Sequence, residues 1–389
     1  MINATDLNTR FHQHFTPTND TPQLYFSPGR VNLIGEYTDY NGGFVFPAAI
    51  TFGTYGVVRP RTDNLIHMFS GNFPDVGVQT LALSATDTPK SEHWTVYVQG
   101  VVATLQASGY TLQHGFDVYV FGDIPNGAGL SSSASIELLF IEILNELNSL
   151  GIDPVEKAKL AQKAEHWVGV NCGIMDQFAI AMGREGHAIK LDTNTLDYTY
   201  AQVELGDYQI LIMNTNKKRE LAESNYNVRR SECEQALAML DIPHSYLCDL
   251  SVAEFDKLSH KLSDHLPLFK RAKHTISESE RVTQAVEALA KGDLKTFGQL
   301  LNASHASLRD DYEVTGKELD TIVAFAQAQP GVLGARMTGA GFGGCAIALV
   351  HSDHLQAVQE QVATGYTQAI GYAPTFYTCT IGGGTGRVS

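Results

Sequence analysis

The sequence lacks a long apolar segment. No stretch of its 389 residues approaches the roughly 18 consecutive apolar side chains that indicate a membrane-spanning helix. The first 21 residues are polar and contain no apolar core of the kind found in secretory signals. We therefore expect a cytoplasmic protein with no membrane partner.

Cysteine is scarce as well, and no two cysteines form a C-x-x-C pair. An odd number of scattered cysteines is typical of reduced thiols, and it argues against a disulfide framework or a zinc site. The five are Cys172, Cys233, Cys248, Cys345 and Cys379.

Basic residues are fewer than acidic ones, with 27 Lys and Arg against 42 Asp and Glu, so the net charge is −15. Nucleic acids bind proteins through clustered positive charge, so the sequence predicts no nucleic-acid partner. If the protein handles phosphate, it must use local devices such as backbone amides, helix ends, a metal ion or one or two placed cations.

With about 150 residues per domain as a guide, the length favours two domains and leaves three open. Apolar segments at 116–121, 187–191, 208–213 and 345–350 predict strands, and the region 221–328 is mainly helical in character. The sequence therefore predicts an α+β fold with two lobes, covering residues 1–200 and 201–389.

Several helices are marked by their ends. Apolar residues at helical spacing predict a helix over Ser135–Leu150. Asp153 is the expected N-cap of the next helix, with Pro154 in its first position. Thr315 and Glu318 have the spacing of a capping box.

A first glycine-bearing motif, at 28–43, reads PGRVNLIGEYTDYNGG. It places Arg30, Glu36 and Asp39 within ten residues of each other. Carboxylates on such a loop can accept hydrogen bonds from several sugar hydroxyls at once. Taken by themselves, these residues are equally compatible with a solvated surface turn.

A second motif, at 125–135, reads PNGAGLSSSAS and precedes an apolar helix. Its glycines let successive amides point at one spot, and the helix N-terminus carries a partial positive charge. We predict a phosphate-binding loop that is not a Walker A loop, because Gly-Lys-Ser/Thr is missing. The alternative is a simple linker into the helix, which a position between a strand and an apolar helix disfavours.

A third motif, at 334–345, reads GARMTGAGFGGC. Gly339, Gly341 and Gly344 satisfy the dinucleotide-binding pattern G-x-G-x-x-G, but that pattern requires a helix to follow. Here an apolar strand-like run follows, so we expect a glycine loop packed against a second ligand.

The segment 165–177 reads EHWVGVNCGIMDQ. Asn171 is the expected cap of a short helix over 173–182, which places Asp176 in the first turns. The helix field there favours the ionised carboxylate. A purely structural role for Asp176, as a cap or ion-pair partner, is the alternative.

Together these motifs resemble the galactokinases of the GHMP kinase family. The segments at 125–135 and 334–344 are similar to motifs of the whole family. The segments at 29–43, 172–177, 224–230 and 304–310 are similar to galactokinases in particular. The resemblance extends from about residue 20 to the C-terminus, in the same order.

This resemblance implies an N-terminal lobe like the second domain of ribosomal protein S5 and a C-terminal ferredoxin-like lobe. ATP and the sugar would meet between the lobes, and we expect a monomer. The residues implied at the sugar are Arg30, Glu36, Tyr37, Asp39, Gly173, Asp176 and Tyr226. Those implied at ATP are Pro125, Gly127, Ala128, Gly129, Leu130, Ser131, Ser132, Ser133, Ala134, Ser135, Trp94 and Val98. The glycine-rich loop is represented by Gly339, Gly341, Gly343 and Gly344.

The implied reaction transfers the γ-phosphoryl group of ATP to the C1 hydroxyl of α-D-galactose, as the first step of galactose use. Asp176 would act as the base beside Arg30. Ser133 and Glu165 match the positions of the Mg²⁺ ligands.

Tyr37 departs from the resemblance, because galactokinases usually have histidine there, so sugar discrimination is open at this position. One alternative is a kinase for a related substrate, such as N-acetylgalactosamine or mevalonate. A second is a non-catalytic galactose and ATP sensor, and a third is a nucleotide-binding structural protein.

Overall fold

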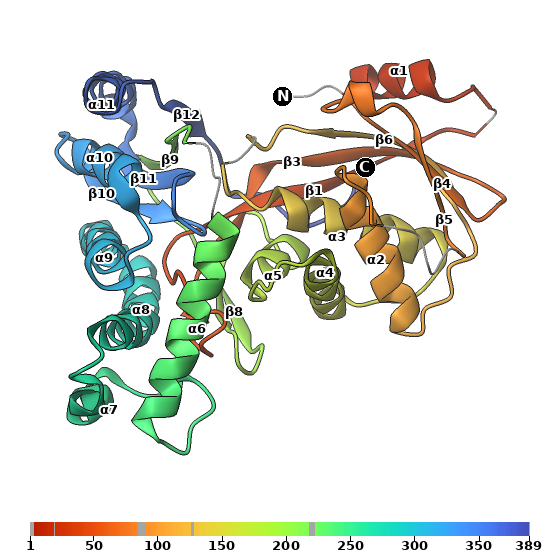
Figure 1. Ribbon diagram of the computed structural model, residues 1–389. Helices are drawn as coiled ribbons and strands as arrows, with labels where there is room; N and C mark the ends of the chain where they lie inside the picture. The colour runs from red at the N-terminus through yellow and green to blue at the C-terminus, as the bar shows by residue number, and fades with distance from the viewer. Residues whose placement is uncertain (1–3, 19, 85–89, 126–127, 218–221, 389) are drawn as a thin grey trace.

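The computed structural model describes residues 4–18, 20–84, 90–125, 128–217 and 222–388. They form two lobes, each built on its own β-sheet, with a small third sheet between them (Figure 1). Among the described residues, no helix has the length and apolar character needed to cross a bilayer.

The first lobe contains a six-stranded sheet in the order β13-β1-β3-β6-β4-β5. Only β4 and β6 pair in parallel; the other neighbours are antiparallel. The strands are β1 (Gln23–Asn32), β3 (Pro47–Pro60), β4 (Leu65–Ser70), β5 (Gln79–Ala82), β6 (Phe116–Gly122) and β13 (Gly386–Arg387).

Helices cover both faces of this sheet because neighbouring residues along its strands point to opposite sides. Val58 packs with the buried face of one helical layer, whereas Val57 packs with Leu7 and Phe11 on the other side. The first layer consists of α2 (Thr95–Ala107), α3 (Ser132–Leu147), α4 (Pro154–Val168) and α5 (Met175–Ala181), and the opposite face carries α1 (Ala4–His14).

The second lobe contains an antiparallel sheet in the order β10-β11-β9-β12. Its strands are β9 (Tyr208–Asn214), β10 (Val332–Thr338), β11 (Cys345–His351) and β12 (Thr375–Thr378). Numbered along the chain, this order is 2-3-1-4, which is the β-α-β-β-α-β arrangement of ferredoxin-like folds. The expected ferredoxin-like lobe is therefore confirmed.

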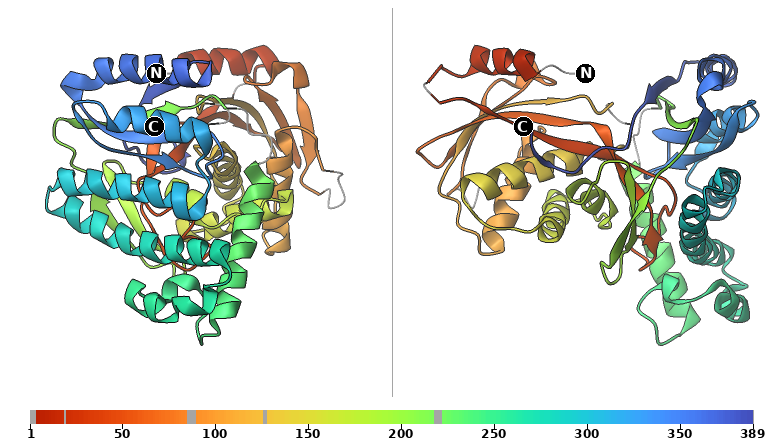
Figure 2. Two further views of the ribbon diagram at one scale, coloured as in Figure 1. Left: turned by 60° about the vertical axis from the view of Figure 1, so that its left-hand side comes forward. Right: turned by 180° about the vertical axis from the view of Figure 1, so that it is seen from behind.

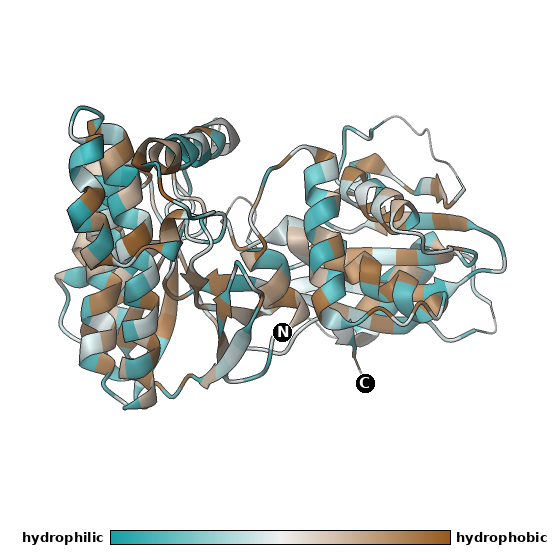
Figure 3. Ribbon diagram, turned by 90° about the horizontal axis from the view of Figure 1, so that it is seen from below, coloured by the Kyte–Doolittle hydropathy of each residue, from teal (hydrophilic) through white to brown (hydrophobic). Residues whose placement is uncertain are grey.

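A helical layer covers this second sheet, with α9 and α10 packed against β10. Figure 3, which views the molecule from below, shows hydrophobic and hydrophilic residues alternating along the helices of this lobe, as expected when one face is buried. The helices are α6 (Ala222–Leu240), α7 (Val252–Leu258), α8 (Leu266–Ala290), α9 (Leu294–Ser307), α10 (Gly316–Gln327) and α11 (Leu355–Ile370).

Two features connect the lobes. A small sheet of β2 (Phe44–Val45), β7 (His187–Asp192) and β8 (Tyr198–Gln202) lies between them. The chain also returns after β12 to the first lobe, where β13 pairs with β1 and Ile381 bridges to Ile50 (Figure 2). The boundary near residue 200 stays a prediction.

The four predicted strands are present as β6, β7, β9 and β11, and the N-cap at Asp153 is confirmed, since its side chain accepts from the Glu156 amide. The helix expected over Ser135–Leu150 instead spans Ser132–Leu147, because the serines of the loop already take helical geometry.

Two predicted caps are wrong. Helix α5 begins at Met175 after Ile174, so Asn171 lies too far upstream to cap it. Thr315 stands at the N-cap position of α10, but its side chain makes no capping bond and Glu318 pairs with Lys217 at 2.9 Å, so the predicted capping box is absent.

Candidate active site

The site is organised around an ion pair that joins two of the predicted motifs within the first lobe. Arg30, on β1, donates from Nε to Asp176 Oδ1 at 2.8 Å and from Nη2 to Oδ2 at 2.7 Å. Its third nitrogen, Nη1, donates to the Gly129 carbonyl at 2.8 Å. This two-point geometry fixes both side chains. Segments 146 residues apart in sequence, and the loop between them, therefore meet at one guanidinium.

Asp176 stands in the first turn of α5, as predicted, and 28% of its side chain is exposed. Its Oδ2 also accepts a hydrogen bond from the hydroxyl of Ser131. Three donors therefore hold an aspartate that is still open to a ligand, which disfavours the alternative of a purely structural cap.

The predicted phosphate loop leads directly into α3. Gly129 and Ser131 both have positive φ, 73° and 63°, which turns the chain sharply before the helix starts. The amide of Arg30 donates to the Leu130 carbonyl at 3.2 Å, and Ala128 donates to Pro125 at the same distance. Gly127 lies outside the described residues.

The serines of the loop divide between several partners. Ser131 binds Asp176, Ser133 donates to Glu165 at 2.7 Å, and Ser135 is buried, where it donates to the Ser27 carbonyl. Only Ser132 is exposed among them. Ala134 and Leu130 are packed into the core. The hydroxyl of Ser135 thus anchors the helix to the sheet, a role that the sequence did not predict.

A second carboxyl lies beside the loop. Glu165, on α4, accepts from Ser133 and from Gln177 Nε2, each at 2.7 Å. Burial raises the pKa of Glu165 to about 7, and the nearby Asp176 adds to the rise. Glu137 is fully buried close by, with no hydrogen-bond partner for either oxygen among the described residues.

This donor set fits a magnesium ion. Mg²⁺ prefers oxygen ligands and is commonly held by one or two carboxylates together with phosphates and water. Ser133 and Glu165 provide a hydroxyl and a carboxylate that already lie 2.7 Å apart. Among the described residues there is no cluster of three or more His, Cys, Asp or Glu that could hold a metal unaided.

The predicted sugar residues gather next to Asp176. Asp39 lies so close to Gly173 that a Cβ on the glycine would be 1.8 Å from Asp39 Oδ2. Burial, reinforced by Asp176 and Glu36, raises the pKa of Asp39 to about 7. Burial, and after it Asp39, also raises the pKa of the Tyr226 phenol.

Glu36 is more deeply buried than predicted for a sugar ligand. Its Oε1 accepts from the Gly339 amide at 2.7 Å and lies 3.4 Å from Arg336 Nη1. Burial raises the pKa of Glu36 despite Arg336 and Arg30. Glu36 therefore connects the sugar signature to the glycine-rich loop.

Arg336 and Glu278, which the sequence reasoning missed, complete this buried network. Arg336 donates to the Asn32 carbonyl at 3.0 Å and to Ser304 Oγ at 3.1 Å. Glu278, on α8, accepts from the Gly35 amide at 3.0 Å. Arg336 lies inside the third glycine motif. Its position between the apolar residues of a strand could have indicated a buried arginine.

Tyr37 is buried, with 4% of its surface exposed, and its hydroxyl donates to the Ala340 carbonyl. Tyr37, which stands where galactokinases usually have histidine, therefore contacts the glycine-rich loop. A direct sugar contact from this side chain stays a prediction.

The glycine-rich loop connects β10 to β11, so the absence of a helix after it is confirmed. All four predicted glycines have positive φ: Gly339 82°, Gly341 68°, Gly343 116° and Gly344 78°. Such values suit glycine and few other residues. A Cβ on Gly339 would lie 2.9 Å from the Gly129 carbonyl, so this loop lies against the phosphate loop.

The two residues assigned to the adenine lie at the start of α2. Val98 is 1% exposed and belongs to the core of the first lobe. Trp94 packs against the same core, and its buried Nε1 has no partner among the described residues. Their role at adenine stays a prediction.

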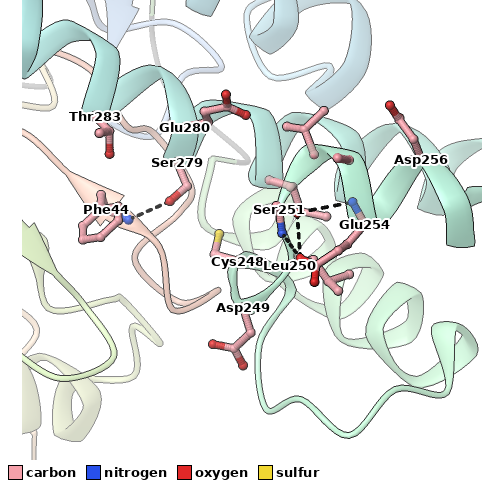
Figure 4. A pocket seen from close by; sticks show the side chains of 13 residues that line it. Phe44, Cys248, Asp249, Leu250, Ser251, Glu254, Asp256, Ser279, Glu280 and Thr283 are labelled. Atoms are coloured by element: carbon pink, nitrogen blue, oxygen red, sulfur yellow. Dashed lines mark hydrogen bonds between the residues drawn. The ribbon is translucent and has the colours of Figure 1, made fainter.

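A separate cavity of about 670 Å³ lies behind the sugar signature (Figure 4). Ser279, on its wall, accepts from the Phe44 amide at 3.1 Å, and Cys248 lies where a Cβ on Gly43 would fall, at 2.6 Å. None of the predicted site residues is among the described residues that line it. Ser279 and Cys248 therefore support the turn at Gly43 and Phe44.

The sequence matches three family models. Residues 9–60 match the galactokinase galactose-binding signature, residues 96–184 the N-terminal domain of GHMP kinases, and residues 285–368 their C-terminal domain.

Known proteins match nearly the whole chain. A galactokinase of Lactiplantibacillus plantarum is 53% identical over 98% of this chain and 99% of its own length. One from Streptococcus suis is 52% identical over 99% and 98%. The crystal structure of the Lactococcus lactis galactokinase complexed with galactose superimposes with a TM-score of 0.96, at 48% identity and 99% coverage of both chains.

More distant structures share the fold alone. The Methanococcus jannaschii mevalonate kinase has a TM-score of 0.67 at 18% identity, covering 94% of this chain and all of its own. The two-lobed α+β fold, the galactose-binding signature and the identity over the full length agree. The chain belongs to the galactokinases, phosphotransferases of the GHMP kinase family.

Proposed function

We propose that this protein transfers the γ-phosphoryl group of ATP to the C1 hydroxyl of α-D-galactose, giving galactose 1-phosphate and ADP. The observation that carries the proposal is the Arg30–Asp176 pair. Its atoms lie 2.7–2.8 Å apart, with the guanidinium also bonded to the phosphate loop at Gly129. A base for the sugar and the loop for the nucleotide thus share one arginine.

Asp176 accepts the proton of the C1 hydroxyl as that oxygen attacks phosphorus. General-base assistance of this kind is worth about 10²–10⁴-fold in rate. Arg30 orients the aspartate through two hydrogen bonds and can neutralise charge on the transferring phosphoryl group. Ser131 holds the Oδ2 atom from the other side.

Asp39, Gly173 and Tyr226 form the sugar side of the site, with Glu36 behind them. The raised pKa of Asp39 supports this, because an acceptor with no cation of its own is suited to hydroxyl donors. A site built of such acceptors rejects an analogue that lacks the hydroxyl, so deoxygalactose should be a poor substrate where it is contacted.

The loop at 125–135 and the N-terminus of α3 hold the triphosphate, with Trp94 and Val98 assigned to the adenine. Ser133 and Glu165 would hold Mg²⁺, which supplies positive charge to the phosphates when bound. The chain's own contribution is to orient these two oxygens, through Gln177 on Glu165 and the helix that carries Ser133.

The test is a panel of sugars with ATP and Mg²⁺, scored by ADP release and by the position of the new phosphate in ³¹P and ¹³C NMR spectra. We expect phosphate on C1 of galactose and little turnover of N-acetylgalactosamine, mevalonate or deoxygalactose. Faster turnover of N-acetylgalactosamine would assign a different substrate. Binding of ATP and galactose without ADP release would assign a sensor.

A further inference from the structure

Tyr37 has a backbone conformation that a large side chain rarely adopts. Its φ is 67°, in the left-handed region. Such a value is a clear outlier for a bulky residue, and it persists only where the surroundings fix it. One fixed point is the Tyr37 carbonyl, which accepts from Asn41 Nδ2 at 2.9 Å. The conformation points to a function for the side chain.

The ring of Tyr37 is enclosed by other aromatic rings. Its centroid lies 4.6 Å from that of Tyr312, 5.5 Å from that of Tyr226 and 6.2 Å from that of Tyr40. Only 4% of the residue is exposed, so the surrounding side chains fix the orientation of the ring. The phenol oxygen is therefore held in place by packing.

The phenol oxygen of Tyr37 contacts the glycine-rich loop. The Tyr37 hydroxyl donates to the Ala340 carbonyl, and the preceding residue, Glu36, accepts from the Gly339 amide at 2.7 Å. Two consecutive residues of the sugar signature thus hold two consecutive residues of the loop. On its other side Gly339 touches the phosphate loop, since a Cβ there would be 2.9 Å from the Gly129 carbonyl.

We infer that Tyr37 is a positioning residue that couples the sugar site to the nucleotide site by holding Gly339 and Ala340 against the phosphate loop. Asp39 lies two residues further along the same turn, so a sugar that orders this turn also orders the loop. Binding of the second ligand then costs less conformational entropy, and this makes the binding of the two ligands cooperative. This inference rests on the proposed function.

The test compares Tyr37→Phe with the natural protein by titration calorimetry, using a non-hydrolysable ATP analogue with Mg²⁺, with and without saturating galactose. Loss of one hydrogen bond corresponds to about a 3- to 10-fold change in affinity. We expect nucleotide binding to weaken by that factor in the presence of galactose, and the enhancement by galactose to shrink equally. Any loss of galactose affinity without nucleotide should be smaller than the loss of nucleotide affinity, and in turnover the KM for ATP should rise more than kcat falls.

Tyr312→Phe is the matched control. It removes a hydroxyl from the same aromatic cluster, but that hydroxyl bonds Tyr40 at 2.7 Å and Cys233 at 3.2 Å and does not touch the loop. Equal effects of the two variants on the galactose enhancement would overturn the inference, as would a Tyr37→Phe variant that loses galactose affinity alone. If the natural protein binds neither ligand, the proposed function itself fails, and thermal unfolding of each variant separates these results from misfolding.

Discussion

Two groups of buried carboxyls in this protein differ in their balance of charge. Around Glu278, two arginines, Arg281 and Arg336, face two carboxyls, the second being Glu36. Around Asp176 one arginine, Arg30, faces Asp176, Asp39 and Glu165, and Glu36 of the first group lies near it as well. In the first group the arginines equal the carboxyls in number. In the second group the carboxyls outnumber the arginine, so negative charge is not balanced within the protein.

The pKa values follow this difference at Glu278, Asp39 and Glu165, whereas at Glu36 burial raises the pKa although Arg336 lies 3.4 Å away. Although burial alone would raise it, Arg281, then His274 and Arg336, lower the pKa of Glu278 to about 2. Burial without an equal number of cations raises the pKa of both Asp39 and Glu165 to about 7. The balanced group is expected to stabilise the fold, whereas the unbalanced group is expected to bind hydroxyl donors and a cation.

The largest effect is expected at the unbalanced group. Asp176→Asn should lower turnover by about 10²–10⁴-fold, because the general base is lost, while galactose binding changes only severalfold. Initial rates of ADP release and calorimetric galactose titrations measure the two quantities. Asp153→Asn is a control, because asparagine caps α4 equally well far from the site. Turnover of Asp176→Asn within severalfold of the natural protein would remove Asp176 as the base.

At the balanced group the loss should be in stability. Arg336→Met leaves Glu36 and Glu278 buried with one cation fewer, so the free energy of unfolding should fall by about 3–5 kcal/mol. Urea denaturation measures this quantity. The control is Lys291→Met, which breaks an exposed pair with Glu287 and should cost less than about 1 kcal/mol. Similar losses in the two variants would contradict the structural role of the group.

The close approach of Gly173 to Asp39 allows a change in sugar binding with little change in stability. In Gly173→Ala the new Cβ would displace the Asp39 carboxylate, whose Oδ2 lies 1.8 Å away. Loss of one charged hydrogen bond corresponds to about a 10- to 100-fold weaker galactose affinity. Gly383→Ala serves as the control, since no atom lies within 4 Å of a Cβ there. Unchanged galactose affinity would remove Asp39 from the sugar site.

The smallest effect is a pH dependence of galactose binding. Because the pKa of Asp39 is raised to about 7, the carboxyl is largely protonated at pH 6 in the free protein. Galactose hydroxyls bind the ionised form, so binding below pH 7 must release a proton. Affinity should therefore fall by up to about tenfold per pH unit below 7 and level off above it. Calorimetry between pH 5.5 and about 8.5 measures this, and Asp39→Asn should remove the dependence.

The local elements could largely be predicted from the sequence, because apolar periodicity and capping residues act within a few positions. Asp153 caps α4 and the strand β11 follows the glycine-rich loop, both as predicted. Asn171 failed as a cap because α5 begins only at Met175. Thr315 directly precedes α10 but makes no capping bond, and Glu318 pairs with a distant residue, Lys217, which sequence spacing does not reveal.

Contacts between distant segments could not be predicted in this way. The Arg336 network joins β10 to α8 and to the sugar signature, residues about 60 to 300 apart along the chain. The hydroxyl of Ser135 faces the sheet and that of Ser131 faces Asp176, although both stand in one predicted loop.

The sequence by itself determined which residue types were present and in what order: the sugar signature, the phosphate loop, the glycine-rich loop and the acid at Asp176. Only the tertiary structure decided which carboxyls are balanced by arginine and which are not. Charge balance depends on distances through space and on burial, and both are set by how the lobes pack rather than by spacing along the chain.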